Sequence, residues 1–79
     1  MTADELVKFQ TNPNELHGSK FALRHNTGNL EMYEVIGYHK KRDKSVEYEV
    51  LFESIPQHPI IYDAKDMEKM LWDSYYIPM

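Results

Sequence analysis

The sequence predicts a small α+β fold that is mainly β, with about four to five antiparallel strands, a short N-terminal helix and a C-terminal helix. Three observations carry this prediction. Residues 46–53 alternate between apolar and acidic side chains, which is typical of a half-buried strand. Residues 26–29 and 40–45 are polar segments that separate strand-like runs. Both ends of the chain combine helix-capping residues with an apolar stripe. At 79 residues, the chain is expected to form one domain, residues 1–79.

A capping motif predicts a helix at the start of the chain. Thr2 and Glu5 have the spacing of a capping box, in which each side chain satisfies a backbone N–H group of the other. A face that can be buried follows at Leu6, Val7 and Phe9. Residues 12–18 open with Asn-Pro, which ends a helix, and reach a glycine at Gly18. We therefore expect a loop there, with one helical turn closed by that glycine.

The first two strands are expected to form a hairpin. Residues 20–25 can extend as a strand with Phe21 and Leu23 facing the core. Asn-Thr-Gly-Asn at 26–29 is a turn signal, because Asn and Gly tolerate positive φ. In residues 30–39, both the even-numbered and the odd-numbered positions include apolar side chains, and these two sets point to opposite faces of a strand. This predicts a strand that is buried on both sides.

A bend, a charged tip and a second hairpin strand come next. Gly37 is the expected place for a bend or a β-bulge. Residues 40–45 are expected to form a solvated tip. The strand that follows has a core face and an acidic face. The core face is formed by Val46, Tyr48, Val50 and Phe52, and the acidic face by Glu47, Glu49 and Glu53.

The last third of the chain predicts a rigid loop, a short strand and a helix. Residues 54–59 contain two prolines, and residues 60–62 are apolar enough for a fourth strand. Asp63 or Asp66 then caps the closing helix. Its apolar stripe is predicted at Met67, Met70, Leu71 and Ser74. Three large aromatic residues crowd toward its end: Trp72, Tyr75 and Tyr76.

The composition indicates in which cellular compartment the protein works and which classes of partner it can bind. The chain has no cysteine, which excludes disulfides and thiolate chemistry and is typical of a reducing cytoplasm. No apolar run approaches the roughly 18 residues of a membrane span, and Asp4 and Glu5 do not resemble a secretory signal, so neither a membrane nor secretion is expected. Of nine basic residues, four lie within 40–44. The rest of the chain contains five basic and twelve acidic residues. Most of the surface should therefore repel a phosphate backbone.

This order of helices and strands is typical of a small SH3-like barrel. Residues 33–72 contain Tyr-Glu-Val-Ile at 33–36, the basic hairpin, the strand at 46–52, and Tyr62 ahead of a helix. With these features the segment resembles a chromo domain. In chromo domains, aromatic side chains cage a methylated lysine by cation–π attraction. The resemblance implies a possible aromatic pocket at Tyr33, Phe52 and Tyr62, with Ile55 at the place of a further cage residue.

Nothing in the sequence predicts an enzyme, a metal site or a cofactor. The four histidines, His17, His25, His39 and His58, have no short metal-ligand spacing. The serines lie outside any nucleophile-elbow context, and three glycines form no phosphate loop. Asp63 and Asp66 are interpreted as helix-capping groups rather than as a catalytic pair.

Two kinds of partner are open. Nucleic acid could contact the basic tip at Lys40, Lys41, Arg42 and Lys44. Asp43 interrupts this run, and pairing of its lysines with the acidic face of the next strand would use up the charge locally, which favours a solvated tip that protects the sheet from edge pairing.

A protein partner is the favoured hypothesis. Trp72, Tyr75 and Tyr76 could either pack over the open end of the barrel or supply an interface anchor, with packing favoured for Trp72. The predicted protein-binding surface combines these aromatics with Glu47, Glu49 and Glu53. The sequence thus predicts a non-enzymatic, cytoplasmic module, a small regulator or inhibitor of the kind that phages and mobile elements encode, which docks on a larger complex. Both a monomer and a homodimer fit.

Overall fold

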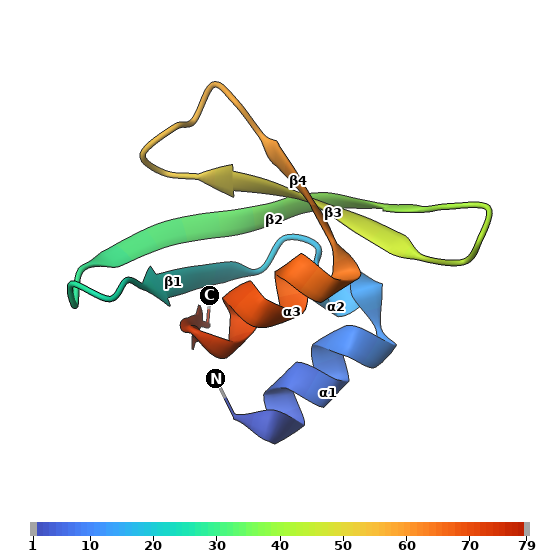
Figure 1. Ribbon diagram of the computed structural model, residues 1–79, viewed down its shortest axis with the longest axis horizontal. Helices are drawn as coiled ribbons and strands as arrows, with labels where there is room; N and C mark the ends of the chain where they lie inside the picture. The colour runs from blue at the N-terminus through green and yellow to red at the C-terminus, as the bar shows by residue number, and fades with distance from the viewer. Residues whose placement is uncertain (1, 79) are drawn as a thin grey trace.

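The computed structural model describes residues 2–78 and shows an α+β fold in which helices cover one face of a single sheet (Figure 1). The elements in chain order are α1 (Ala3–Thr11), α2 (Pro13–Leu16), β1 (Lys20–Arg24), β2 (Leu30–Lys40), β3 (Val46–Phe52), β4 (Ile60–Asp63), α3 (Ala64–Trp72) and β5 (Ser74–Ile77). All neighbouring strands are antiparallel, and their spatial order is β4-β3-β2-β1-β5. None of the helices in residues 2–78 is long and apolar enough to cross a membrane.

The predicted SH3-like barrel is not confirmed, because the sheet is open. β4 and β5 lie at opposite edges of the sheet and do not pair with each other. After β4, the chain enters α3, which lies over one face and carries the chain across the sheet to the outer side of β1 (Figure 1). A closed barrel would need its two edge strands, β4 and β5, to pair with each other.

The closing helix is shorter than predicted, and its last expected residues form a strand instead. α3 begins after the cap at Asp63, whose side chain accepts a hydrogen bond from the Asp66 N–H group at 2.7 Å, as the sequence predicts. It ends at Trp72, and Asp73 caps its C-terminus. Residues 74–77 then pair with β1, and Tyr75 and Tyr76 lie in this strand rather than on a helix. Tyrosine and isoleucine favour strands.

The predicted N-terminal capping box is present. The Thr2 hydroxyl accepts a hydrogen bond from the Glu5 N–H group at 3.2 Å and donates one to the Glu5 carboxylate at 3.1 Å. The short α2 follows, and Gly18 ends it with φ of 84°, a conformation that favours glycine. Gly28 adopts φ of 88° in the turn between β1 and β2, where the sequence predicts positive φ.

The predicted bulge in β2 is confirmed, and it explains the apolar residues on both sides of this strand. Val35 pairs with Val50, but the next pair is Gly37 with Glu49, so Ile36 is an extra residue. Before the bulge, Tyr33 and Val35 face the helices. After it, the alternation shifts by one and Tyr38 packs against the core. The prediction of a strand buried on both sides is therefore wrong: Leu30 and Met32 are exposed.

The core lies between the helices and the sheet. Its buried residues come from every element except β4 and β5: Leu6, Phe9, Leu16, Phe21, Tyr33, Val35, Tyr48, Val50, Phe52, Met67 and Leu71. Leu23, predicted to face the core, packs against it while partly exposed. Ser74 in β5 is also buried. Its hydroxyl donates to the Met70 carbonyl at 2.7 Å and accepts from the Tyr33 hydroxyl at 2.8 Å. This pair of bonds joins α3, β2 and the start of β5.

Candidate functional site

The fold leaves the face of the sheet opposite the helices, the helix-free face, without a covering layer of helices (Figure 1). In β3, Tyr48, Val50 and Phe52 belong to the core, so the residues between them point away from the helices. The cross-strand pairs extend this assignment to the other strands. The helix-free face comprises Lys20, Ala22, Arg24, Leu30, Met32, Glu34, Gly37, His39, Glu47, Glu49, Leu51, Glu53, Ile61, Asp63, Tyr75 and Ile77.

One part of this face is acidic. We define the acidic half as Glu47, Glu49, Glu53 and Asp63, which lie in or directly after β3 and β4. The structure thus brings together the three glutamates that the sequence predicts for a partner. Asp63 is added because it pairs in register with Glu47 across β3 and β4. Sequence alternation alone did not reveal Asp63, because its capping role was the more obvious signal.

The carboxylates of the acidic half differ in how far they are neutralised. The Lys41 ammonium lies 3.5 Å from the Glu47 carboxylate, which confirms the cross-strand pairing expected for the hairpin. Glu49 stands opposite Gly37, which offers no side chain to pair with it. Within residues 2–78, no cation lies within ion-pair distance of Glu49 or Glu53. These two carboxylates therefore keep their charge available to another molecule.

An apolar cleft of about 340 Å³ adjoins the acidic half. It opens between β2, β3 and the loop at 53–59, and its lining includes Met32, Leu51 and Pro56 together with the charged Lys20, Glu34 and Glu53. The Lys20 ammonium and the Glu34 carboxylate pair across β1 and β2 at 4.0 Å. The cleft thus places an apolar floor next to the unpaired Glu53 carboxylate.

The aromatic residues predicted for the same surface are split between two faces and the sheet edge. Tyr75 lies on the helix-free face and is 49% exposed. Tyr76 points to the helix side, where its ring centroid lies 5.7 Å from those of Phe9 and Phe21, yet it stays 43% exposed. Trp72 ends α3 and is 49% exposed, so it is not one of the buried core residues. β1 and β2 lie between the β5 tyrosines and β3, so Tyr75 and Tyr76 are about 14 Å from the β3 strand by the usual strand spacing.

The basic hairpin is exposed and projects past the helices (Figure 1). Its tip is closed by a hydrogen bond of 2.8 Å from the Lys41 N–H group to the Ser45 carbonyl, and Lys44 adopts φ of 71°. Only Lys41 forms an ion pair among the described residues of this hairpin. Lys40, Arg42 and Lys44 therefore remain candidates for contact with phosphate.

The three residues of the possible aromatic pocket pack against one another, and two of them belong to the core. Tyr33 and Phe52 have ring centroids 5.5 Å apart, and Tyr62 lies 6.4 Å from Phe52, so the three rings do come together. Tyr33 and Phe52 are buried core residues, however. Burial raises the pKa of Tyr33 far above its usual value, against the opposing effect of its hydrogen bond with Ser74. Tyr33 and Phe52 also contribute to the lining of the cleft between β2, β3 and the loop at 53–59.

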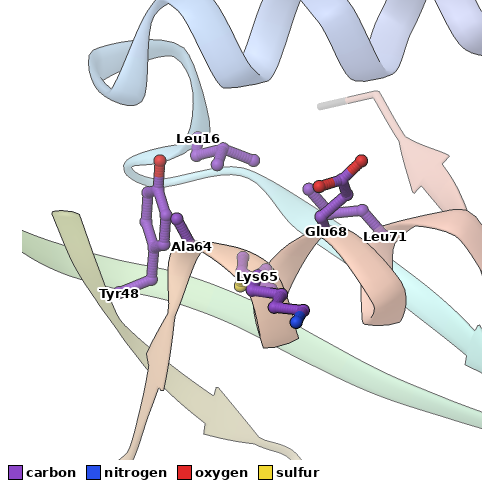
Figure 2. Close-up of a pocket in the computed structure, with 7 residues that line it drawn as sticks. Leu16, Tyr48, Ala64, Lys65, Glu68 and Leu71 are labelled. Carbon is purple, nitrogen blue, oxygen red and sulfur yellow. The ribbon is translucent and has the colours of Figure 1, made fainter. Parts of the chain in front are cut away.

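A second cleft, of about 320 Å³, lies in the helix layer and was missed by sequence reasoning (Figure 2). Leu16 from α2 and Tyr48 from β3 line it opposite α3 residues that include Ala64, Lys65 and Glu68. Burial raises the pKa of Tyr48, and the nearby Tyr38 adds to this effect. Leu16 lies in a segment predicted as a loop, so no sequence pattern linked it to α3.

Titratable side chains at the other end of β2 form a hydrogen-bonded cluster around Glu31. Glu31 accepts hydrogen bonds from Ser54 and from His25, the latter at 3.0 Å. The Ser54 bond, followed by the bond and charge of His25, lowers the pKa of Glu31 despite partial burial. The Glu31 carboxylate lies between the His25 ring and the Ser54 hydroxyl and bonds to both. His25 therefore makes no hydrogen bond with the Ser54 hydroxyl, which a general base for that hydroxyl would need. Among residues 2–78, no three His, Asp or Glu residues form a group that could hold a metal ion.

Comparison with known proteins returns no matching family model, no matching curated protein and no matching solved structure. The surfaces described above therefore carry the functional conclusion alone.

Proposed function

We propose that this protein is a non-enzymatic protein-binding module whose acidic half docks on a basic segment of a larger protein. The observation that carries this proposal is the position of two carboxylates without ion-pair partners, Glu49 and Glu53, on a face that no helix covers. Isolated acidic residues are common on protein surfaces, but these two flank apolar side chains. Glu49 pairs in register with the exposed Ile61, and Glu53 lines the cleft with Leu51 and Met32.

Charge and apolar area would have different roles in such a complex. Carboxylates that face a cationic partner speed diffusional encounter and disfavour acidic competitors. Apolar side chains that become buried contribute favourable free energy of association, part of which offsets the cost of ordering both partners. The basic partner segment would place its cations at Glu49 and Glu53 and one apolar side chain in the cleft. A role as a cytoplasmic regulator or inhibitor, encoded by a phage or mobile element, is part of this proposal.

A charge-reversal comparison tests the proposal. The tagged protein is used to capture partners from a lysate of its native cell after nuclease treatment, and the captured proteins are identified by mass spectrometry. The same capture is repeated with Glu49→Lys and with Glu68→Lys, a matched control on α3 in the helix layer. Both variants change the net charge equally. We expect a stoichiometric partner with a basic segment that is lost with Glu49→Lys and retained with Glu68→Lys.

Two results would contradict the proposal. Equal retention of the partner by both variants would show that the acidic half is not the contact surface. A partner whose binding does not weaken between about 50 and 200 mM salt would show that charge does not contribute to the contact, because exposed charges are screened over this range.

The alternative is a nucleic-acid-binding module that uses the basic hairpin. The exposure of Lys40, Arg42 and Lys44 at a projecting tip supports it. Phosphate contact needs only clustered cations, and each contact on duplex DNA lowers log K by about 0.9 per decade of salt. Loss of all captured material after nuclease treatment, together with loss of duplex binding in Arg42→Glu, would favour this function over the first.

A further inference from the structure

We propose that β5 pairs with β5 of a second copy of this chain, so that two open sheets join into one. β5 is an edge strand of four residues, Ser-Tyr-Tyr-Ile, and it carries no charged side chain. Proteins usually protect exposed edges with charge, because a bare edge offers a template for another strand. This pairing goes beyond the proposed function, since it uses the opposite edge of the sheet from the acidic half.

The orientation of the β5 backbone fixes which residues can meet. The Arg24 N–H group donates to the Asp73 carbonyl at 2.8 Å, which makes Arg24 and Asp73 a hydrogen-bonded pair in register with the β1–β5 ladder. Such pairs alternate along an antiparallel ladder. Ala22 and Tyr75 are therefore the next hydrogen-bonded pair, and the peptide groups of Tyr76 point outward from the sheet.

One register satisfies both the backbone and the two faces. A twofold axis perpendicular to the sheet keeps the helix-free faces of both copies on the same side. Because side chains alternate along a strand, an odd-numbered residue of β5 must then lie opposite an odd-numbered residue of the second copy, and an even-numbered residue opposite an even-numbered one. Centring the axis on Tyr75 places Tyr75 opposite Tyr75 of the second copy. It also allows the Tyr76 N–H group to donate to the Ser74 carbonyl of the second copy. Centring on Tyr76 instead would bring in Pro78, which has no N–H group.

This register makes the helix-free face self-complementary. Met32, Ala22 and Tyr75 form one cross-strand row, and the second copy continues it as Tyr75, Ala22 and Met32. The next row aligns Ile77 with Asp73 of the second copy, so that this carboxylate lies two strands from Lys20, about 10 Å away by strand spacing. A lysine and an aspartate side chain can span this distance. The apolar row becomes continuous, and the charged row brings opposite charges together.

The side chains at this edge have the exposure that such an interface would remove. Trp72 and Tyr75 are each about half exposed and line a cleft of about 230 Å³ with Arg24 and Asp73. In the proposed register, Ile77 of the second copy lies opposite Asp73 and can enter this cleft. The β4 edge is a poorer self-association surface, because its neighbours Glu47, Glu49 and Asp63 would face the same charges in a second copy.

A single cysteine tests the register directly, because the chain has none of its own. Tyr75 and its counterpart would form a non-hydrogen-bonded pair with Cα atoms about 4.5 Å apart, within the range that a disulfide spans. We expect Tyr75→Cys to form a covalent dimer under mild oxidation roughly tenfold faster than Ile61→Cys, an equally exposed matched control on the β4 edge. Equal rates for the two variants would overturn the proposal.

Charge swapping provides a second readout that does not depend on oxidation. In sedimentation equilibrium of the purified protein, Tyr75→Lys and Tyr75→Glu should each weaken the wild-type dimer roughly fivefold or more, because like charges would meet at the axis. An equimolar mixture of the two variants should regain association through a Lys–Glu pair. A wild-type protein that stays monomeric at several hundred micromolar, or a mixture no tighter than either variant alone, would refute the pairing. Neither result depends on the basic partner of the acidic half.

Discussion

Removal of the Ser74 hydroxyl should destabilise the protein more than its size suggests. Ser74 is 1% exposed and is the one buried polar residue among the described core positions. Its hydroxyl accepts the hydrogen bond of the Tyr33 phenol, which is also buried. In Ser74→Ala, the phenol keeps its place in the core but loses this partner. A buried polar group left unsatisfied costs about 1–3 kcal/mol. The Met70 carbonyl loses less, because it still accepts from the Asp73 N–H group at 3.2 Å.

We therefore expect Ser74→Ala to lower the free energy of unfolding by about 2 kcal/mol and the Tm by about 10 °C, as is typical for a domain of this size. The assay is urea and thermal unfolding followed by circular dichroism. Tyr33→Phe should cost less, about 1 kcal/mol, because it removes one hydrogen bond and leaves Ser74 bonded to Met70. In the double variant the two losses should not add, since Tyr33→Phe already removes the phenol that Ser74→Ala would leave unsatisfied.

The double-variant cycle contains the result that would refute this reasoning. The hydrogen bond between Tyr33 and Ser74 is the source of the cost if Ser74→Ala is well tolerated once Tyr33→Phe is present. An equal cost of Ser74→Ala in both backgrounds would place its effect in α3 or β5 instead, and a cost below about 0.5 kcal/mol in the wild-type background would show that the phenol finds another partner or water.

Three further predictions concern the core, a turn and pH. Phe21→Ala removes a fully buried ring between Phe9 and Tyr33 and should cost about 3–5 kcal/mol, measured by urea unfolding. Gly28→Ala should cost about 1 kcal/mol because of its positive φ, whereas Gly37→Ala should cost less, since the nearest atom to an added Cβ lies at an ordinary 3.8 Å; the same unfolding assay compares them. Glu31 has a lowered pKa, so its contribution to stability is present above the ordinary value of 4.5 and is lost as the pH falls through the lower folded value; a Tm series from pH 6 to 3 should show a smaller loss for Glu31→Gln.

Local signals in the sequence predicted local structure well. The capping box at Thr2 and the cap at Asp63 each involve a side chain and a backbone group three residues away, so neighbouring residues determine them. The turn at Gly28 and the bulge next to Gly37 likewise depend on residues that lie close together in the chain. The acidic face of β3 was predictable for the same reason, because alternation along one strand decides which side chains share a face.

β5 was not predictable from its own residues. Ser74 continues the helical spacing of Met67, Met70 and Leu71, so a local pattern extends the helix through it. The structure ends the helix at Trp72 because two distant groups compete for this segment: the Tyr33 phenol bonds the Ser74 hydroxyl, and β1 pairs with residues 74–77. Barrel closure would also need the outer edge of β5 to pair with β4, but these two strands lie at opposite edges of the open sheet.

The strand order also separates the two surfaces that the sequence predicted as one. Glu49 and Tyr75 share a face, but β2 and β1 lie between their strands. A single small partner anchored at both positions would have to cover most of the sheet. Two partners of different kinds fit this spacing better: a basic segment at the acidic half and a second copy at β5. Pairing through β5 leaves both acidic halves at the far ends of the joined sheet, where nothing covers them. Tyr75→Lys should therefore weaken self-association roughly fivefold or more while leaving the affinity for a basic partner within about twofold, because exposed substitutions remote from a contact rarely change its energy by more than a few tenths of a kcal/mol.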